Sequence, residues 1–415
     1  MIDKNRYRTI VFILLGILVF FVYGYHFYLP REPYFDEILY VNFMRSLGAG
    51  EYSITLSAHP PLWNFLMAGC VRVFGDYSWS WRLVSLLAGV GVLIVLYFLV
   101  KQITQDVTTS LLAVFFMLFD CLSLTQARAA MMNAFLLLWM LLSMLFFFYA
   151  LEGKASFNRK YLLLSGIFLG LALATKILVF NMVFFFGPFV LIYAWQRKAE
   201  RGKFLMWSAV CFILIPVVMF FCVYVPVMFF KDHQAVDIWA IPLFHLQYHF
   251  STKQTHPYVS DWWTWPAMAR PVWMYFQTAY YGTPGATVEG IVCIGNPALF
   301  WMMPVAIGYM LWEGLKNKSR VAGIILAGFA SQWLCYIFVS RMKFLHYMYP
   351  VMPFLAMAFA VMGVKLWNKG KIGRAVVIYY LVLTAGMFVF WYPLLTGLPV
   401  SASFYSHHIW FRSWV

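Results

Sequence analysis

The stretch LVSLLAGVGVLIVLYFLV, residues 83–100, contains no charged side chain in 18 positions. A helix needs roughly 20 mainly apolar residues to cross a hydrocarbon core about 30 Å thick. Similar runs recur along the 415 residues, of which 63% are hydrophobic and only 11% charged, whereas soluble domains are about half apolar and a quarter charged. A membrane β-barrel would alternate apolar and polar residues instead. The sequence therefore predicts an all-α polytopic membrane protein, because a helix satisfies its own backbone groups in lipid.

About eleven membrane segments are expected from the lengths of these runs. The first, Ile10–Tyr28, is longer than the apolar region of a signal peptide and has no small-residue cleavage site, so we expect it to be retained. The others are Leu83–Val100, Val107–Phe119, Ala134–Ala150, Tyr161–Thr175, Ile177–Trp195, Phe204–Phe230, Ile291–Trp312, Val321–Ser340, Phe344–Val364 and Ala375–Leu395. The runs that begin at Val107 and Tyr161 are short, so a re-entrant or partly buried course stays open for both.

The basic residues predict the orientation of the chain. With the N-terminus in the cytoplasm, 18 of the 30 Lys and Arg residues but only 5 of the 15 acids lie on the cytoplasmic side. Cytoplasmic loops are enriched in Lys and Arg, so the net charge of +15 indicates membrane orientation and no nucleic-acid partner. Two long loops, 30–82 and 231–290, then lie outside, and we expect function there. Residues 1–415 are expected to form one domain, and the six scattered cysteines predict neither disulfides nor a zinc site.

The first external loop carries an acidic pair, Asp36-Glu37, ahead of a segment with the apolar spacing of an interfacial helix. Acids in a first helical turn often only complement the helix dipole. A carboxylate at a membrane face beside an apolar wall is also suited to a raised pKa and to general-base catalysis. Farther along, His59-Pro60-Pro61 predicts a rigid corner, which either simply starts the next helix or also holds His59 over the cavity that contains Asp36.

Several cations lie at predicted outer ends of spans, namely Arg128, Lys176, Arg341 and Lys343. Long basic side chains commonly extend to the membrane surface, which is the simplest explanation. The enrichment of Lys and Arg in cytoplasmic loops nevertheless disfavours cations on this face. Their convergence therefore suggests an anionic ligand, and a lipid phosphate fits the chemistry of these side chains.

The second external loop contains HPYVSDWWTWP, residues 256–266. Trp and Tyr are common at membrane interfaces, which would account for the aromatic residues alone. The additional His, Ser and Asp side chains favour a binding site for a sugar or a peptide.

Taken in order, these motifs resemble the protein O-mannosyltransferase family, membrane glycosyltransferases of the GT-C fold that use a polyprenyl-phosphate sugar. The resemblance covers nearly the whole chain, and the ordered set is specific although each motif alone is weak. It rests on Asp36-Glu37, HPPL at 59–62, Gln126-x-Arg128, the segment Gly170 to Lys176, the stretch His256 to Pro266, Gly295-Asn-Pro297 and Tyr347-x-x-Pro350.

The resemblance implies inverting transfer of mannose from dolichyl- or polyprenyl-phosphate mannose to a Ser or Thr hydroxyl of a protein. Asp36 would be the base, Glu37 and His59 would organise the site, and Arg128 would hold the donor phosphate. Lys176 and Arg341 are the further candidates for phosphate binding. The residues expected to border the acceptor or the sugar are His256, Tyr258, Ser260, Trp262, Trp263 and Trp265.

Two departures from the family pattern affect the expected sugar or phosphate contacts. Trp63-Asn64 stands where the family often has Gly-Lys, and Asn133 stands where Asp is common. The β-trefoil insertion of eukaryotic members is missing between Lys231 and Gly290, which favours a prokaryotic-type enzyme in the plasma (inner) membrane with its active site outside.

Other possibilities stay open at this point. A related enzyme of the same fold could move another sugar, or use a lipid acceptor of the lipid A type; a transporter is more distant, because the charges gather at one face. No cofactor is expected beyond the lipid-linked donor. We expect metal-independent transfer, although Asp36, Glu37 and His59 could supply ligands to a divalent ion. Membrane lipids and a protein acceptor are the expected partners, and a dimer stays open.

Overall fold

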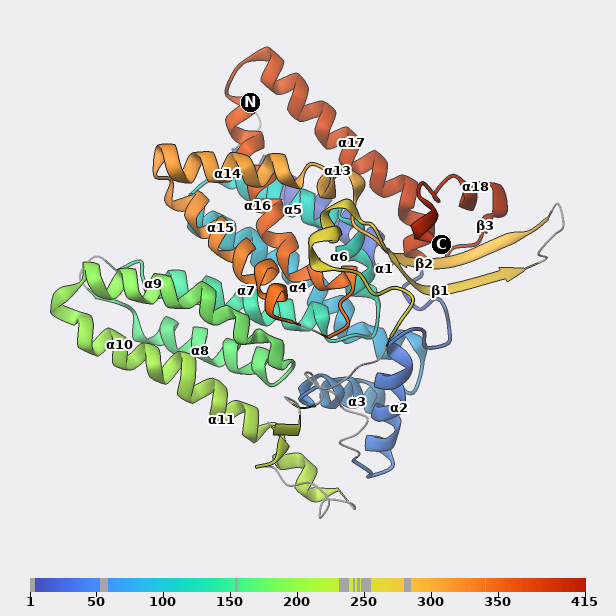
Figure 1. The fold of residues 1–415 in the computed structure, drawn as a ribbon, viewed down its shortest axis with the longest axis horizontal. Helices are drawn as coiled ribbons and strands as arrows, with labels where there is room; N and C mark the ends of the chain where they lie inside the picture. The colour runs from blue at the N-terminus through green and yellow to red at the C-terminus, as the bar shows by residue number, and fades with distance from the viewer. Residues whose placement is uncertain are drawn as a thin grey trace.

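The computed structural model is a mostly helical assembly with one small sheet (Figure 1). It describes residues 4–52, 59–153, 156–230, 239–241, 243–244, 247, 255–279, 285–339 and 341–415, with side chains from residue 13 onward. The helices are α1 (Lys4–Gly24), α2 (Glu37–Gly48), α3 (Leu62–Phe74), α4 (Ser78–Thr104), α5 (Val107–Leu118), α6 (Cys121–Arg128), α7 (Asn133–Ala150), α8 (Arg159–Leu173), α9 (Met182–Gln196), α10 (Arg201–Ala209), α11 (Ile215–Cys222), α13 (Pro297–Phe300), α14 (Met303–Asn317), α15 (Arg320–Trp333), α16 (Met352–Trp367), α17 (Lys371–Thr396) and α18 (Ala402–Ser406).

Among the described residues, eight helical segments are long and apolar enough to cross a membrane, or nine if the bent pair α5–α6 is one span. Each of the segments predicted from the sequence is largely helical, but about eleven full spans were expected. The difference lies in α1, whose described apolar part is only Ile13–Gly24, in α8, which has 15 residues, and in the bent pair. A polytopic membrane fold is thus confirmed.

The break between α5 and α6 explains why the run from Val107 is short. Asp120 adopts extended backbone angles and its carboxylate accepts a hydrogen bond from the backbone N–H of Ser123 at 2.8 Å, which starts a new helix. The two helices meet at 68°. All eight residues of α6 are buried, so this segment bends toward the interior of the protein.

Asn296, in the Gly295-Asn-Pro297 motif, fixes this bend to the second half of the chain. Its amide nitrogen donates to the carbonyl of Phe119 at 2.7 Å and to that of Thr384 in α17 at 2.9 Å. Its backbone N–H donates to Asp120 at 3.2 Å, and its side-chain oxygen caps α13. The motif therefore has a structural explanation, since one buried side chain joins three elements.

The chain before α13 contributes to a sheet that the apolar pattern of the sequence did not predict. Strands β1 (Val272–Ala279), β2 (Thr287–Cys293) and β3 (Val400–Ser401) pair antiparallel in the order β1-β2-β3. The span expected from Ile291 therefore starts only at Pro297, because residues 291–293 end β2. The β1–β2 hairpin extends beyond the helices (Figure 1).

The C-terminal segment anchors the base of this hairpin. The indole N–H of Trp273 donates to the carbonyl of Trp414 at 2.7 Å, and the indole N–H of Trp414 donates to the carbonyl of Met268 at 2.8 Å. Residues from the end of the chain thus hold the base of the hairpin in place.

Candidate functional site

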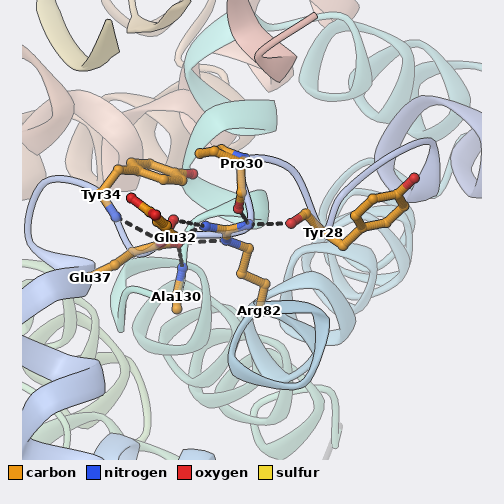
Figure 2. A network of polar contacts seen from close by, with 7 residues as sticks. All are labelled: Tyr28, Pro30, Glu32, Tyr34, Glu37, Arg82 and Ala130. Carbon is orange, nitrogen blue, oxygen red and sulfur yellow. Dashed lines mark hydrogen bonds and ion pairs between the residues drawn. The ribbon is translucent and has the colours of Figure 1, made fainter. Parts of the chain in front are cut away.

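Glu37, at the start of α2, is completely buried and paired with Arg82 from α4 (Figure 2). The Nε and Nη2 atoms of Arg82 donate to the two carboxylate oxygens at 2.9 and 2.7 Å. The carboxylate also accepts from the backbone N–H of Ala130 at 2.6 Å and from that of Tyr34 at 3.3 Å. These contacts occupy both oxygens, so Glu37 joins the start of α2 to α4 and to the segment after α6.

Arg82 also orders the chain between α1 and α2. Its Nη1 atom donates to the carbonyls of Tyr28 and Pro30 at 2.9 and 2.6 Å, and its Nη2 atom donates to that of Glu32 at 3.2 Å (Figure 2). The guanidinium lies over the ring of Tyr34, 4.9 Å from its centroid. Sequence reasoning placed Arg82 only at the end of a loop, because nothing local shows that its partners lie about 50 residues away.

Asp36 occupies the N-cap position of α2, but its side chain makes no capping hydrogen bond. Burial raises the pKa of this carboxyl to about 6, and the nearby cations Lys176 and Arg341 oppose that rise. The preceding residue, Phe35, has a φ of 50°, which is unusual for a bulky side chain and costs backbone energy. The Asp36 carboxylate therefore interacts electrostatically with two cations and makes no capping hydrogen bond to α2.

Lys176 lies between α8 and the 3₁₀ turn Ile177–Asn181, and it is buried. Its Nζ atom donates to the side-chain oxygen of Asn133 at 3.3 Å and lies 5.3 Å from the ring centroid of Tyr347. Burial and the neighbouring Arg341 lower the pKa of Lys176 to about 8, against the opposite effect of Asp36. At neutral pH this lysine is therefore still mainly protonated.

Arg341 approaches the same aromatic ring from the second half of the chain. Its Nη2 atom donates to the Tyr347 hydroxyl at 3.1 Å, and its guanidinium carbon lies 5.8 Å from the ring centroid. His346, which directly precedes Tyr347, is 4% exposed, and its Nδ1 atom has no hydrogen-bond partner within the described part of the chain. The sequence motif Tyr347-x-x-Pro350 pointed to this region, but His346 itself was missed.

Arg128 is directed elsewhere. Its guanidinium donates to the backbone carbonyl of Tyr25 at 2.8 Å and to that of His26 at 3.0 Å, at the end of α1. The electrostatic neighbours of Asp36 are Lys176 and Arg341, and Arg128 is not among them. Of the three cations predicted for a donor phosphate, the structure brings together Lys176 and Arg341.

His59 is half-buried at the corner that leads into α3. The N-cap of α3 is Pro61, and the backbone N–H of Leu62 donates to the carbonyl of Ala174 at 3.3 Å. The corner therefore lies beside the segment that carries Lys176. The placement of His59 over the cavity that contains Asp36 stays a prediction.

The predicted acceptor stretch divides into two groups. His256 lies beside Phe35 with ring centroids 6.2 Å apart, so it faces the loop of Asp36, and burial lowers its pKa. Ser260 instead accepts a hydrogen bond from the buried indole of Trp265 at 3.0 Å, and the side chain of Trp263 is 64% exposed. The remaining predicted residues, Tyr258 and Trp262, are half-buried.

Two aromatic rings, Phe35 and Tyr347, connect these elements. Phe35 also contacts His346, at 6.0 Å between ring centroids. The candidate site thus combines the Asp36 loop, the Lys176 segment and the Arg341–Tyr347 segment. Within the described ranges, no three His, Cys, Asp or Glu side chains are grouped as they would be around a metal ion.

Comparison with known proteins identifies the family. A sequence profile described as dolichyl-phosphate-mannose-protein mannosyltransferase matches residues 22–241, and a profile of the C-terminal four-span region of protein-O-mannosyltransferase matches residues 236–414. The polyprenol-phosphate-mannose--protein mannosyltransferase of Mycobacterium tuberculosis is 25% identical over 425 residues, covering 86% of this chain and 81% of that protein.

Solved structures share the fold. The Saccharomyces cerevisiae protein O-mannosyltransferase Pmt1-Pmt2 complex bound to the sugar donor matches with a TM-score of 0.85 at 12% identity, over 100% of this chain and 93% of that chain. ArnT from Cupriavidus metallidurans in the apo state matches with a TM-score of 0.59 at 15% identity, over 95% of this chain and 77% of that chain. These matches confirm the expected GT-C fold. Since the two profiles together span nearly the whole sequence, the chain belongs to the dolichyl-phosphate-mannose-protein mannosyltransferase family.

Proposed function

We propose that this protein transfers mannose from a polyprenyl-phosphate donor to a Ser or Thr hydroxyl of a protein. The observation that carries the proposal is the desolvated Asp36 carboxyl facing two cations, Lys176 and Arg341. A carboxylate with a raised pKa can accept a proton from a hydroxyl, and cations can hold a phosphate leaving group. Family membership supplies the sugar and the lipid-linked donor.

In the proposed reaction, the acceptor oxygen attacks the anomeric carbon while the bond from that carbon to the phosphate oxygen breaks. The hydroxyl proton passes to Asp36, and the electron pair of the broken bond stays on the polyprenyl phosphate. Lys176 and Arg341 stabilise the negative charge that develops there. Attack from the face opposite the phosphate inverts the anomeric configuration. Because phosphate is already a good leaving group, orientation and charge stabilisation supply most of the rate enhancement.

A second feature supports a site for the lipid part of the donor. An apolar cavity of about 440 Å³ lies between α8, α9, α10 and α11. Its lining includes Leu173 and Val179, which flank Lys176 by three positions on either side. A polyprenyl chain in this cavity would therefore leave its phosphate at Lys176.

The other predicted residues take supporting roles in this proposal. Glu37 positions Asp36 through Arg82, and Arg128 holds the end of α1 and does not contact phosphate. His346 offers a buried imidazole to the donor, and His256 borders the acceptor side. We place the site on the outer face of a prokaryotic plasma membrane, as the basic residues suggest, and we keep both metal independence and a dimer as proposals.

The purified protein tests this proposal directly. Incubated in lipid with polyprenyl-phosphate mannose and a Ser/Thr-rich peptide, it is expected to form mannosyl peptide without an added metal ion. Consumption of the donor without peptide product would instead favour a lipid acceptor. No use of the donor would refute the mannose assignment, and activity that chelator abolishes and one divalent ion restores would refute metal independence.

Replacing Lys176 by Met is expected to raise the KM for the donor by about 10- to 100-fold, because one charge-assisted contact to phosphate contributes about 1.5–3 kcal/mol. The KM for the peptide should change little. Lys343→Met is the matched control, since its Nζ atom donates to the carbonyl of Val339 at 2.7 Å and is not among the charges that act on Asp36. Equal donor KM values for Lys176→Met and wild type would contradict the assigned role.

A further inference from the structure

Strand β1 pairs with β2 through one edge only. The sheet order is β1-β2-β3, so β1 is an outer strand, and no strand is paired with its other edge in the part of the chain that the structure describes. The side chains of residues 276–279 are exposed. An outer strand presents alternating N–H and C=O groups that can pair with another extended chain.

The residues of this edge lack the usual protection. Proteins commonly guard exposed strand edges with charged side chains or Pro, yet residues 275–279 read Tyr-Phe-Gln-Thr-Ala. The strand is bulged only near its inner end, between Trp273 and Tyr275. An uncharged, regular edge of this kind is suited to binding, and its chemistry selects a partner with a peptide backbone.

The inner end of the edge lies at the candidate site. Residues 272–274 are buried, whereas Tyr275 is half-buried and its ring lies 6.2 Å from that of Tyr34, centroid to centroid. Tyr34 precedes Asp36 by two positions, and its backbone N–H is held by Glu37. In Figure 1, β1 is the strand of the hairpin nearest to the loop between α1 and α2. The edge therefore begins beside Tyr34, two positions before the proposed base, and runs outward.

We infer that the free edge of β1 binds the acceptor polypeptide as an added strand, with the reacting Ser or Thr at the Tyr275 end beside Asp36. This inference rests on the proposed function. At about 3.3 Å per residue, the four steps from Tyr275 to Ala279 span about 13 Å, so roughly five acceptor residues on one side of the hydroxyl are bound. Pairing through the backbone recognises an extended polypeptide with little regard to its side chains, whereas a lipid or a free sugar has no matching series of groups.

Backbone-methylated acceptor peptides test the inference. The peptides carry one central Thr, and a single N-methyl group is placed at each of the five positions on either side in turn. Alternate N–H groups of an added strand face β1. On one side of the central Thr, methylation at every second position is therefore expected to raise the peptide KM by about 3- to 10-fold. This is the effect of losing one hydrogen bond. The intervening positions should change little. Equal KM values for all methylated peptides, or effects without alternation, would overturn the inference.

Proline substitutions in β1 provide an independent test of the inference. Consecutive residues of β1 direct their N–H groups to opposite edges of the strand. Of the two variants Gln277→Pro and Thr278→Pro, one therefore removes an N–H group from the unpaired edge and leaves the hydrogen bonds to β2 intact. That variant is expected to raise the peptide KM several-fold while the donor KM stays unchanged. Unchanged peptide KM in both variants would count against the inference. Absence of transfer to the unmethylated peptide by wild type would instead refute the proposed function.

Discussion

Replacing Asp36 by Asn is expected to lower kcat for mannose transfer by about two to four orders of magnitude, the usual contribution of a positioned general base. Asn has nearly the same size but cannot accept the hydroxyl proton. The side chain makes no capping hydrogen bond in α2, so the helix should be unaffected. Single-turnover transfer to peptide at saturating donor measures the chemical step, and the donor KM reports whether the phosphate site survives.

Asp76→Asn provides the matched control for this substitution. Asp76 also lies between α1 and α4, but its carboxylate pairs with Arg45 at 2.8 Å and its side chain is 43% exposed. Transfer by this variant should stay within about twofold of wild type, because exposed ion pairs contribute little. If Asp36→Asn retained wild-type kcat, the base would have to be another group and the proposed mechanism would fail.

The acidic side of the pH dependence follows from the same carboxyl. A general base acts in its ionised form, so kcat/KM should fall as pH decreases below the pKa of Asp36, about 6. Above that value it should stay level until Lys176, with a pKa of about 8, loses its charge. Lys176 and Arg341 lower this pKa. Removing the positive charge in Lys176→Met should therefore move the acidic limb to higher pH. The residual activity of Asp36→Asn should lack that limb altogether.

The sequence predicts the helical membrane fold well because the signal is local. Apolar runs such as Leu83–Val100 correspond to α4 (Ser78–Thr104), and the acidic pair at Asp36 marks the loop of the candidate site. Run length alone cannot distinguish a full span from a short or bent helix. The turn at Asp120 depends on its bond to Asn296, which lies 176 positions away in the sequence.

Neither the sheet nor the different contacts of the cations could be predicted, because both depend on residues that are distant in the sequence. The β1 residues are mainly aromatic and apolar, a composition equally typical of an interfacial belt. Arg128 and Arg341 look alike in the sequence, but Arg128 donates to backbone carbonyls at the end of α1 whereas Arg341 contacts Tyr347. Only tertiary contacts distinguish a cation that binds backbone carbonyls from one that lies near Asp36.

Substitutions in the Glu37–Arg82 pair are expected to give the largest loss of stability. Both side chains are fully buried, and removing one partner of a buried ion pair costs about 3–5 kcal/mol because the other charge stays unpaired. Glu37→Gln and Arg82→Met should therefore each lower the midpoint of thermal unfolding by several degrees. The double variant Glu37→Gln/Arg82→Met should lose less than the sum of the two single losses, since no unpaired charge remains.

The same variants distinguish a positioning role for Glu37 from a catalytic one. If Glu37 acts by holding the loop of Asp36, Glu37→Gln should lower stability and kcat together, and the acidic limb of the pH profile should remain, because Asp36 is still the base. Disruption of the exposed pair in Asp76→Asn should change the unfolding midpoint far less. A Glu37→Gln variant with wild-type stability but no transfer activity would show that Glu37 acts on the substrate, which its enclosure by Arg82 and by the backbone of Ala130 argues against.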